Sequence, residues 1–514
     1  MNIWFDTTLL SQGSTNACES HHLYECPNDS CPRDGRDGFP SIPSFPNISI
    51  IPILSEEDTL FLHTHTFTCS KTLYTQTFGD SRWIICDPAR QGGIVVVDTE
   101  MHRLLMSFRS PKTLYNATEE SSMSLSSVER AATFLTYLGF LLDLDHPTPI
   151  PNQQPDQSLA AWLHVTNACN LRCHYCYVQK NSEHMTDDIS KRAVDAVIRS
   201  ATRYHHQHIH LSYAGGEATL QLPQVLATHD YALQQTQEHK LGLSASMISN
   251  GVLMPQWAIE QLKQRQIRVG ISLDGIGENH DKQRPFVNGK GSFAFVDRTI
   301  TRLLAGGLVP SINVTVTQRN LDELPRLLEY ILQRELPFGL SYYRDNECST
   351  HLSDLQFTDD RMIDGMRAAF AYIEQHLPRR PLLGLLVDKA STHAPRQYTC
   401  GVGRNYLAID QRGGIAKCHA DITNTVTSIY EDNPLQVIRA HRQGIQAVTV
   451  EEKEGCRACE WRYWCTGGCP LLTYRATGRS DIKSPNCNIY KALFPEALRL
   501  EALRLLKYEK PVII

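Results

Sequence analysis

The stretch CNLRCHYCY holds three cysteines within eight residues, at Cys169, Cys173 and Cys176. Three thiols cannot all pair as disulfides, and they are one ligand short of a tetrahedral zinc site. Zinc with His174 as the fourth ligand is one interpretation, but His174 lies between two of the cysteines and would strain a tetrahedron. Buried free thiols fit poorly because the residues between the cysteines are polar. A third interpretation is a [4Fe–4S] cluster held by three thiolates, which leaves one iron open to another ligand.

The chain carries no convincing signal of export. Its N-terminus lacks a basic start followed by an apolar core, and no apolar run reaches the ~18–20 residues that cross a bilayer. The longest candidate, FLTYLGFLLDLD at 134–145, is short and acidic and predicts a buried helix. We therefore expect a cytoplasmic protein without a membrane partner, in which clustered cysteines hold metals rather than disulfides. The net charge of −5, with Lys and Arg scattered, gives no reason to expect nucleic acid.

Strand-like and helical segments alternate through the middle of the chain. The strand-like runs are 159–166, 208–215, 243–250, 267–275, 310–317 and 338–344, and the helical segments lie near 187–203, 221–238, 255–265, 292–305 and 320–334. Strand–helix units repeated every ~30 residues predict an α/β fold with a parallel sheet, open or curled into a partial barrel. In such folds the chemistry lies at the carboxyl ends of the strands. The three-cysteine stretch directly follows the first strand, where a reaction centre is expected.

The cysteine spacing resembles the signature of the radical S-adenosylmethionine (SAM) enzymes. That signature is Cys-x3-Cys-x2-Cys with an aromatic residue, here Tyr175, before the last cysteine. The resemblance implies that Cys169, Cys173 and Cys176 hold a catalytic [4Fe–4S] cluster whose open iron binds SAM. It also implies that an electron from the cluster cleaves SAM, and that the 5′-deoxyadenosyl radical so formed abstracts a substrate hydrogen. The protein would position the cofactor and exclude water and oxygen.

A second motif of this family ends the second strand, in the stretch AGGEATL. Gly215, Gly216 and Glu217 match a Gly-Gly-Glu motif whose backbone and acid hold the amino group of SAM, although Ala218 stands where proline is usual. An ordinary turn would explain these residues equally well if they stood alone.

Two more motifs follow the third and fourth strands. Asn250, in ISNGVL, matches a strand-end residue near SAM. In SLDGIGENHDKQR, Ser272, Asp274 and Arg284 match positions that contact the ribose and carboxylate of SAM; a guanidinium facing a carboxylate is the expected geometry. Arg284 alone fits a solvated helix start. Four motifs in order at four successive strand ends favour the SAM site instead.

Seven further cysteines form a second group, from Cys400 to Cys487. A Cys-x2-Cys pair alone would favour a zinc ribbon. The full spacing is similar to the SPASM extension of radical SAM enzymes, which carries two auxiliary [4Fe–4S] clusters. The resemblance assigns one auxiliary cluster to Cys456, Cys459, Cys465 and Cys487, and the other to Cys400, Cys418 and Cys469. The second set lacks a fourth cysteine, and His419 stands where sulfatase-maturing relatives place a catalytic aspartate.

Before the first motif, the runs RWIICDP and GGIVVVDTE predict a hairpin with an exposed edge. Helical segments follow, one with a Ser-x-x-Glu start at Ser126. This pattern resembles the winged-helix elements that bind leader peptides by adding a strand to a sheet edge. A Pro/Gln linker puts the domain boundary near residue 150. Cys26 and Cys31 lie near two histidines, but their irregular spacing favours an incidental grouping over zinc.

Six segments follow from these observations. They are a loosely ordered stretch at 1–54, a winged-helix-like α+β domain at 55–150, a partial (β/α)6 radical SAM barrel at 151–345, a connecting helical segment at 346–395, an iron–sulfur SPASM domain at 396–495, and a C-terminal helix and tail at 496–514.

The resemblance implies a maturase of ribosomally made peptides (RiPPs). Such an enzyme would install a carbon–carbon or carbon–heteroatom cross-link in a precursor peptide and would take electrons from a flavodoxin- or ferredoxin-type donor. Two alternatives stay open. One is an anaerobic sulfatase-type maturase that forms formylglycine, and the other is a non-catalytic iron–sulfur or zinc scaffold.

Overall fold

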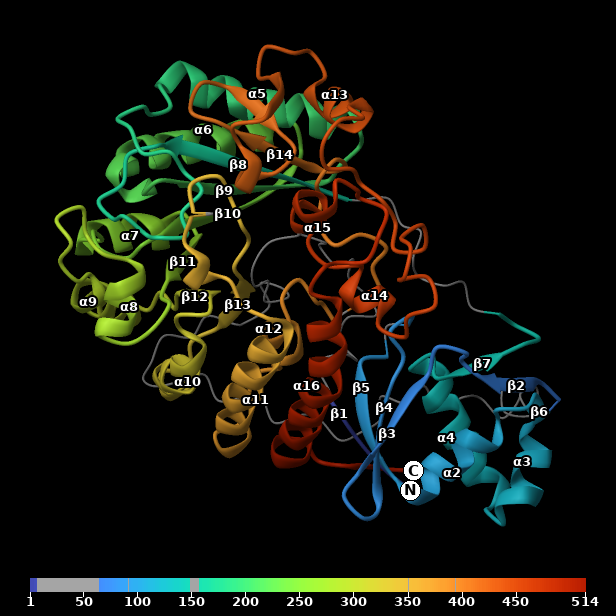
Figure 1. Ribbon diagram of the computed structural model, residues 1–514. Coiled ribbons are helices and arrows are strands. Elements are labelled where there is room, and N and C mark those ends of the chain that lie inside the picture. Colours follow the sequence, from blue (N-terminus) through green and yellow to red (C-terminus); the bar gives the residue numbers. More distant parts are fainter. Residues whose placement is uncertain (7–63, 91, 148–156, 350, 393) are drawn as a thin grey trace. The chain divides into compact units, whose positions relative to one another are not determined.

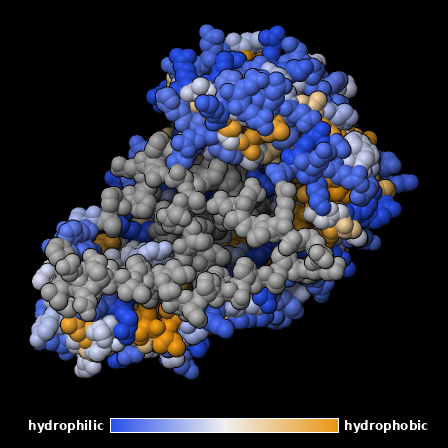
Figure 2. Space-filling view, turned by 180° about the vertical axis from the view of Figure 1, so that it is seen from behind, coloured by the Kyte–Doolittle hydropathy of each residue, from blue (hydrophilic) through white to orange (hydrophobic). Residues whose placement is uncertain are grey.

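The computed structural model describes residues 1–6, 64–90, 92–147, 157–349, 351–392 and 394–514 (Figure 1). The chain forms two compact units. Of the described residues, the first unit holds those up to 147 together with Leu505–Ile514, and the second holds those from 157 to Arg504. Within these ranges no helix is both long and apolar enough to cross a lipid bilayer. The face shown in Figure 2 is largely hydrophilic where it is coloured, with only small hydrophobic patches.

A nine-stranded sheet forms the frame of the second unit, in the order β13-β12-β11-β10-β9-β8-β14-β15-β16. Its first six strands are all parallel to their neighbours. They are β8 (Ser158–Thr166), β9 (His208–Gly215), β10 (Gly242–Ser249), β11 (Ile267–Ser272), β12 (Ser311–Val316) and β13 (Phe338–Tyr342). The predicted parallel α/β sheet is confirmed. Every residue of β8 is buried, as expected for a parallel strand covered on both faces.

Helices connect these strands and lie around the outside of the sheet (Figure 1). They are α5 (Asp187–Arg203), α6 (Leu222–Glu238), α7 (Gln256–Gln264), α8 (Glu278–Gln283), α9 (Phe293–Ala305) and α10 (Leu324–Gln333). Thr186 caps α5 by accepting a hydrogen bond from the backbone N–H of Ile189, which satisfies a donor that the first turn would otherwise leave unpaired.

The sheet continues into the C-terminal region through β14 (Tyr406–Ile409), which pairs with β8 in parallel. β15 (Gly414–Ala416) and β16 (Thr425–Ser428) then follow as antiparallel strands. The remaining helices are α11 (Asp359–Gln375), α12 (Leu383–Leu386), α13 (Pro434–Ala440), α14 (Arg462–Cys465), α15 (Pro470–Thr477) and α16 (Cys487–Tyr508). The cysteine-rich region is therefore built directly onto the first strand of the parallel sheet.

The first unit contains two antiparallel sheets. One has the order β17-β1-β5-β4-β3 and the other β6-β2-β7. Their strands are β1 (Asn2–Phe5), β2 (Thr66–Cys69), β3 (Tyr74–Phe78), β4 (Arg82–Cys86), β5 (Ile94–Asp98), β6 (Lys112–Thr113), β7 (Leu141–Asp143) and β17 (Val512–Ile513). The helices α2 (Thr99–Ser107), α3 (Leu114–Ser121) and α4 (Leu125–Tyr137) contribute to the same hydrophobic core as the sheets.

The predicted hairpin is present as β4 and β5, but it lies inside a larger sheet whose edge strands are β3 and β17. β5 is covered by β1, and β4 is covered by β3. Asn2–Phe5 is therefore an ordered strand rather than part of a loose segment; the rest of the predicted loose segment, from residue 7 to 54, lies outside the described residues. Val512–Ile513 likewise forms a strand in the predicted C-terminal helix and tail.

The predicted buried helix over 134–145 is also wrong in part. α4 ends at Tyr137, and Gly139 follows with φ of +73°, a left-handed conformation that glycine adopts without a steric penalty. The chain then enters β7 instead of continuing the helix. The helix also begins earlier than predicted, because Ser124 rather than Ser126 is the N-cap and accepts from the N–H of Ser127.

Candidate active site and cysteine groups

The three-cysteine loop follows β8 and is held by the segment after α8. The backbone N–H of Arg172 donates to the carbonyl of Pro285 at 2.8 Å, and that of His174 donates to the carbonyl of Gln283 at 3.1 Å. The pKa of the Cys173 thiol is raised to about 12, mainly by burial; the neighbouring Cys176 and Cys169 thiols contribute to the rise, and Arg284 opposes it. The structure therefore brings the three thiols together at the carboxyl end of the sheet.

Two side chains donate hydrogen bonds to these sulfurs. Lys180 Nζ lies 3.0 Å from the Sγ of Cys176, and Asn250 Nδ2 lies 3.8 Å from the Sγ of Cys169. Asn250, from the loop after β10, is 4% exposed, and its side chain also donates to Asn170 Oδ1 at 2.7 Å. A nearby cation and aimed donors stabilise thiolates. Grouped sulfurs with such donors fit a cluster bound by three thiolates. Asn250 was predicted here from its motif, whereas no sequence pattern singled out Lys180.

The two motif glycines permit a close approach of backbones. A Cβ on Gly215, whose φ is +152°, would meet the carbonyl oxygen of Thr166 at 2.4 Å, and one on Gly216 would meet that of Ala168 at 2.3 Å. Any larger residue would push β9 away from the start of the cysteine loop. Ala218, which departs from the usual proline, is buried and begins a short 3-10 helix, Ala218–Gln221.

Glu217 is 1% exposed, and its carboxylate accepts four hydrogen bonds from the protein. Thr219 donates through its N–H at 3.0 Å and its hydroxyl at 2.7 Å, Ser249 through its hydroxyl at 2.8 Å, and Asn250 through its N–H at 2.6 Å. Three of these bonds fall on Oε1 and one on Oε2, so Oε2 keeps a position for a further donor. The motif predicts an acid that holds the amino group of SAM. In the structure the same acid also joins the ends of β9 and β10.

Tyr175, Asp274 and Arg284 form a buried group beside Cys173. Arg284 Nη1 lies 3.2 Å from Asp274 Oδ2, and the Tyr175 hydroxyl donates to the same oxygen while it accepts from Arg284. The other oxygen of Asp274 accepts from the N–H of Thr315 at 2.8 Å. Burial opposes the charge of Arg284, but Cys173, Tyr175 and Asp274 outweigh it and raise the pKa of the guanidinium. The three predicted SAM contacts therefore meet one another, while Ser272 lies partly exposed at the end of β11.

The C-terminal cysteines separate in space into two groups, with the members that the sequence resemblance assigns. The pKa of Cys465 is raised to about 12, mainly by burial, and Cys456, Cys487 and Cys459 lie close enough to contribute to the rise. Burial likewise raises the pKa of Cys418 to about 12. Its neighbours are the other two cysteines of the second set, Cys469 and Cys400.

Basic side chains lie against both C-terminal groups. Burial would raise the pKa of the Cys469 thiol, but Arg344 and Lys389 outweigh it and lower that pKa. Lys453 is 4% exposed and lies near cysteines of both groups; burial lowers its pKa, and the thiols oppose that shift. These positive charges offset the negative charge of thiolate ligands. None of the three was predicted from the sequence, because basic residues without a spacing pattern give no signal.

Aromatic side chains lie between the three-cysteine loop and the Cys400, Cys418 and Cys469 group. Burial raises the pKa of Tyr177, and both Cys176 and Cys418 lie close enough to raise it further. His419 stacks on Trp162 with ring centroids 4.3 Å apart and shares a hydrogen bond of 2.9 Å with the Tyr406 hydroxyl.

Burial lowers the pKa of His419 to about 3, so its ring is neutral. An aspartate at this position would have neither the stacking nor the neutral ring. The remaining cysteine of this region, Cys348, has its Sγ 3.8 Å from the carbonyl oxygen of Tyr177.

Several known proteins are similar to this chain in sequence or in fold. Residues 163–331 match the family model of the Radical SAM superfamily. The PqqA peptide cyclase of Methylobacterium nodulans is 26% identical over 63% of this chain and 84% of its own length. The cysteine-type anaerobic sulfatase-maturating enzyme of Clostridium perfringens is 21% identical over 65% of this chain and 94% of its own. Native anSMEcpe with bound AdoMet and Cp18Cys peptide has a TM-score of 0.54 and 16% identity over 67% of this chain and 99% of that structure.

Proposed function

We propose that this chain, whose residues 163–331 match the Radical SAM superfamily, is a radical SAM maturase that installs a cross-link in a precursor peptide. The observation that carries the proposal is the gathering of ten cysteines into three separate groups, one of them at the carboxyl end of a parallel sheet. The peptide substrate is supported by the relative named PqqA peptide cyclase, which this chain matches over 84% of that protein's length. Cys169, Cys173 and Cys176 would hold a [4Fe–4S] cluster that, together with SAM, would supply the radical chemistry needed to abstract a hydrogen atom from a side chain.

In this proposal Cys169, Cys173 and Cys176 hold the SAM-binding cluster. Tyr175 and the motif residues after β9, β10 and β11 bind or position SAM, and Glu217 acts by holding two strand ends in register. The auxiliary clusters use the two C-terminal cysteine groups, and they would accept the electron released when the substrate radical is oxidised. Tyr177, which lies near both Cys176 and Cys418, and the ring of His419 stacked on Trp162 would help to keep water away from the region between these two cysteine groups.

The cellular setting is part of the same proposal. A flavodoxin- or ferredoxin-type donor would reduce the first cluster, and a reducing cytoplasm would keep the thiols free for iron. The first unit would capture the leader part of the peptide, and the second would contain the radical SAM core and the SPASM region. The linker predicted near residue 150 lies outside the described residues.

Formylglycine formation is the alternative with an observation behind it, because the Clostridium perfringens relative matches over 94% of its length. Against it stands His419, which occupies the position where the sulfatase-maturing relatives place a catalytic aspartate and which stacks on Trp162. The side chain there is an aromatic ring held by stacking, not the carboxylate that those relatives use.

Co-expression with short open reading frames beside the gene tests the function. A cross-link removes two hydrogen atoms from the peptide, so mass spectrometry should find that loss, with fragmentation blocked between the joined residues. A peptide that loses the sulfur of one cysteine would support formylglycine formation instead. Intact peptide from cells whose enzyme cleaves SAM would refute the cross-linking proposal.

The first unit offers β3 as the edge for a bound leader peptide. Among the described residues, no strand pairs with the outer side of Tyr74–Phe78. Saturating peptide should slow hydrogen exchange at about every second amide of β3, because alternate residues of an antiparallel edge strand donate outward. At a peptide concentration of 100 Kd the slowing should approach about 100-fold.

The opposite edge of the same sheet provides the control for this experiment. Val512–Ile513 should exchange at the same rate with and without peptide. Protection at Val512–Ile513 but not at β3 would move the binding site to the other edge. Protection at neither strand, with peptide demonstrably bound, would show that the peptide does not add to this sheet.

A further inference from the structure

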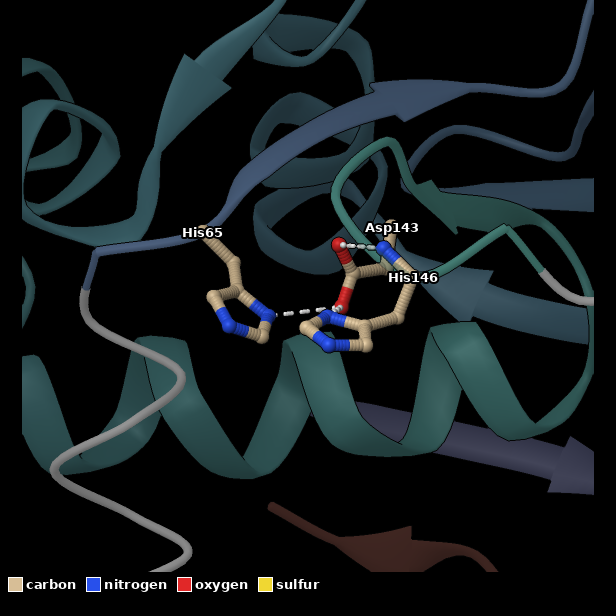
Figure 3. A group of neighbouring side chains, drawn as sticks. All are labelled: His65, Asp143 and His146. Atoms are coloured by element: carbon tan, nitrogen blue, oxygen red, sulfur yellow. Dashed lines mark hydrogen bonds and ion pairs between the residues drawn. The ribbon is translucent and has the colours of Figure 1, made fainter.

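Three metal-ligating side chains converge at one end of the small β6-β2-β7 sheet in the first unit (Figure 3). His65 directly precedes β2, Asp143 ends β7, and His146 follows in the next loop. Nδ1 of His65 lies 2.7 Å from Asp143 Oδ2, and Nδ1 of His146 lies 3.8 Å from the same oxygen. One candidate ligand atom from each residue lies within 4.8 Å of the other two.

We propose that His65, Asp143 and His146 bind a divalent first-row transition-metal ion. Two imidazoles and one carboxylate are donors that zinc and its neighbours accept. Tetrahedral zinc with bonds of about 2.0–2.1 Å puts its ligand atoms roughly 3.3 Å apart. The separations of 2.7 and 3.8 Å lie on either side of that value. Small side-chain rotations therefore suffice to form the site, and the backbone stays in place.

The carboxylate is already oriented for this role. Oδ1 of Asp143 accepts from the N–H groups of Asp145 at 2.9 Å and His146 at 3.1 Å, which turns Oδ2 toward both imidazoles. Partners of this kind hold the ligands of natural metal sites in position. The β2–β7 ladder pairs Phe67 with Asp143, so His65 and Asp143 are fixed relative to each other by the sheet.

The two histidines differ in exposure, which suits a site that is completed by water. The side chain of His65 is 9% exposed and that of His146 is 63% exposed. Their rings stack with centroids 4.6 Å apart. An ion pair would account for His65 and Asp143 alone, but it would not require a second imidazole over the same carboxylate oxygen. A bound ion uses all three and leaves its solvent side for a water ligand.

A metal here would join His65, just before β2, to His146, just after β7. An ion that binds only the folded form stabilises it by mass action. The bound ion would thus stabilise the β6-β2-β7 sheet. The proposed metal site is independent of the function proposed above.

Zinc titration of the full chain with its iron–sulfur clusters intact tests the proposal, because filled cysteine sites do not compete for zinc. Calorimetry should show one equivalent bound by the parent. Loss of a direct ligand in His146→Ala should weaken that binding by at least about 100-fold, since loss of an outer-shell partner alone costs about 10–100-fold. His146 is exposed, so its replacement should leave the fold intact. His239→Ala, at an exposed helix end in the second unit, is the matched control and should bind zinc like the parent.

Hydrogen exchange locates the ion. Zinc should slow exchange in Thr66–Cys69 and Leu141–Asp143 of the parent and of His239→Ala, but not of His146→Ala. Asp143→Asn, which keeps the side-chain size, should lose the same zinc-dependent protection. Equal zinc affinity in the parent and His146→Ala, or no zinc binding by the parent, would overturn the proposal.

Discussion

A chain in which Cys169, Cys173 and Cys176 are all changed to alanine should lose about four of roughly twelve irons and all SAM cleavage. The reason is geometric. These three thiols lie together at the carboxyl end of the sheet, whereas the seven C-terminal cysteines form two groups of their own. Iron analysis of anaerobically reconstituted protein and an assay for 5′-deoxyadenosine measure the two effects.

A second triple variant provides the contrast. Changing Cys400, Cys418 and Cys469 to alanine should also remove about four irons, but it should leave SAM cleavage in place. Peptide cross-linking should then fall, because the proposed electron acceptor is gone. Stoichiometric zinc with negligible iron in the unchanged protein would contradict the assignment of all three groups.

Arg284→Ala should have two separable effects, because Arg284 both faces the proposed SAM site and neutralises Asp274. The carboxylate of Asp274 is 0% exposed, and breaking a buried pair on one side costs about 3–5 kcal/mol. A lost charge-assisted contact to SAM is worth about 1.5–3 kcal/mol, or roughly ten- to a hundredfold in affinity. The variant should therefore unfold more readily and bind SAM more weakly, with its iron count near that of the parent.

The double variant Arg284→Ala with Asp274→Asn separates these effects. Removing the buried charge should restore much of the stability, since no unpaired carboxylate remains. SAM binding should stay weak, because the guanidinium is still absent. Thermal unfolding and SAM calorimetry, both anaerobic, report the two quantities. Parental SAM affinity in either variant would remove Arg284 from the SAM site.

The sequence predicted the parallel sheet well because its six strands and the helices between them each show a clear periodicity of apolar residues. The motif residues also came together as expected, since successive parallel strands end at one edge of the sheet. The membership of the two C-terminal cysteine groups came from the resemblance to the SPASM extension, and in the structure the cysteines of each set lie near one another.

The parts that sequence missed lack such local signals. β17 has two residues and β15 has three, too few to show alternation. β1 has an alternating burial pattern, but its partners lie about 90 and 510 residues away along the chain. Glu217 shows a different limit. Its motif identifies the residue, but only the folded structure shows that four protein groups donate to the carboxylate.

The pairing of β1 with β17 has a consequence for how the protein is made. Asn2 pairs with Ile513 and Ile3 with Val512, and the labels N and C lie side by side in Figure 1. At about 5–20 residues per second, a ribosome needs roughly 25–100 s to reach the second partner. Until then, the edge of β1 that pairs with β17 has no partner strand. An unpaired strand edge invites pairing with other chains. All ten clustered cysteines, from Cys169 to Cys487, are made in the meantime, before the five-stranded sheet of the first unit can be completed.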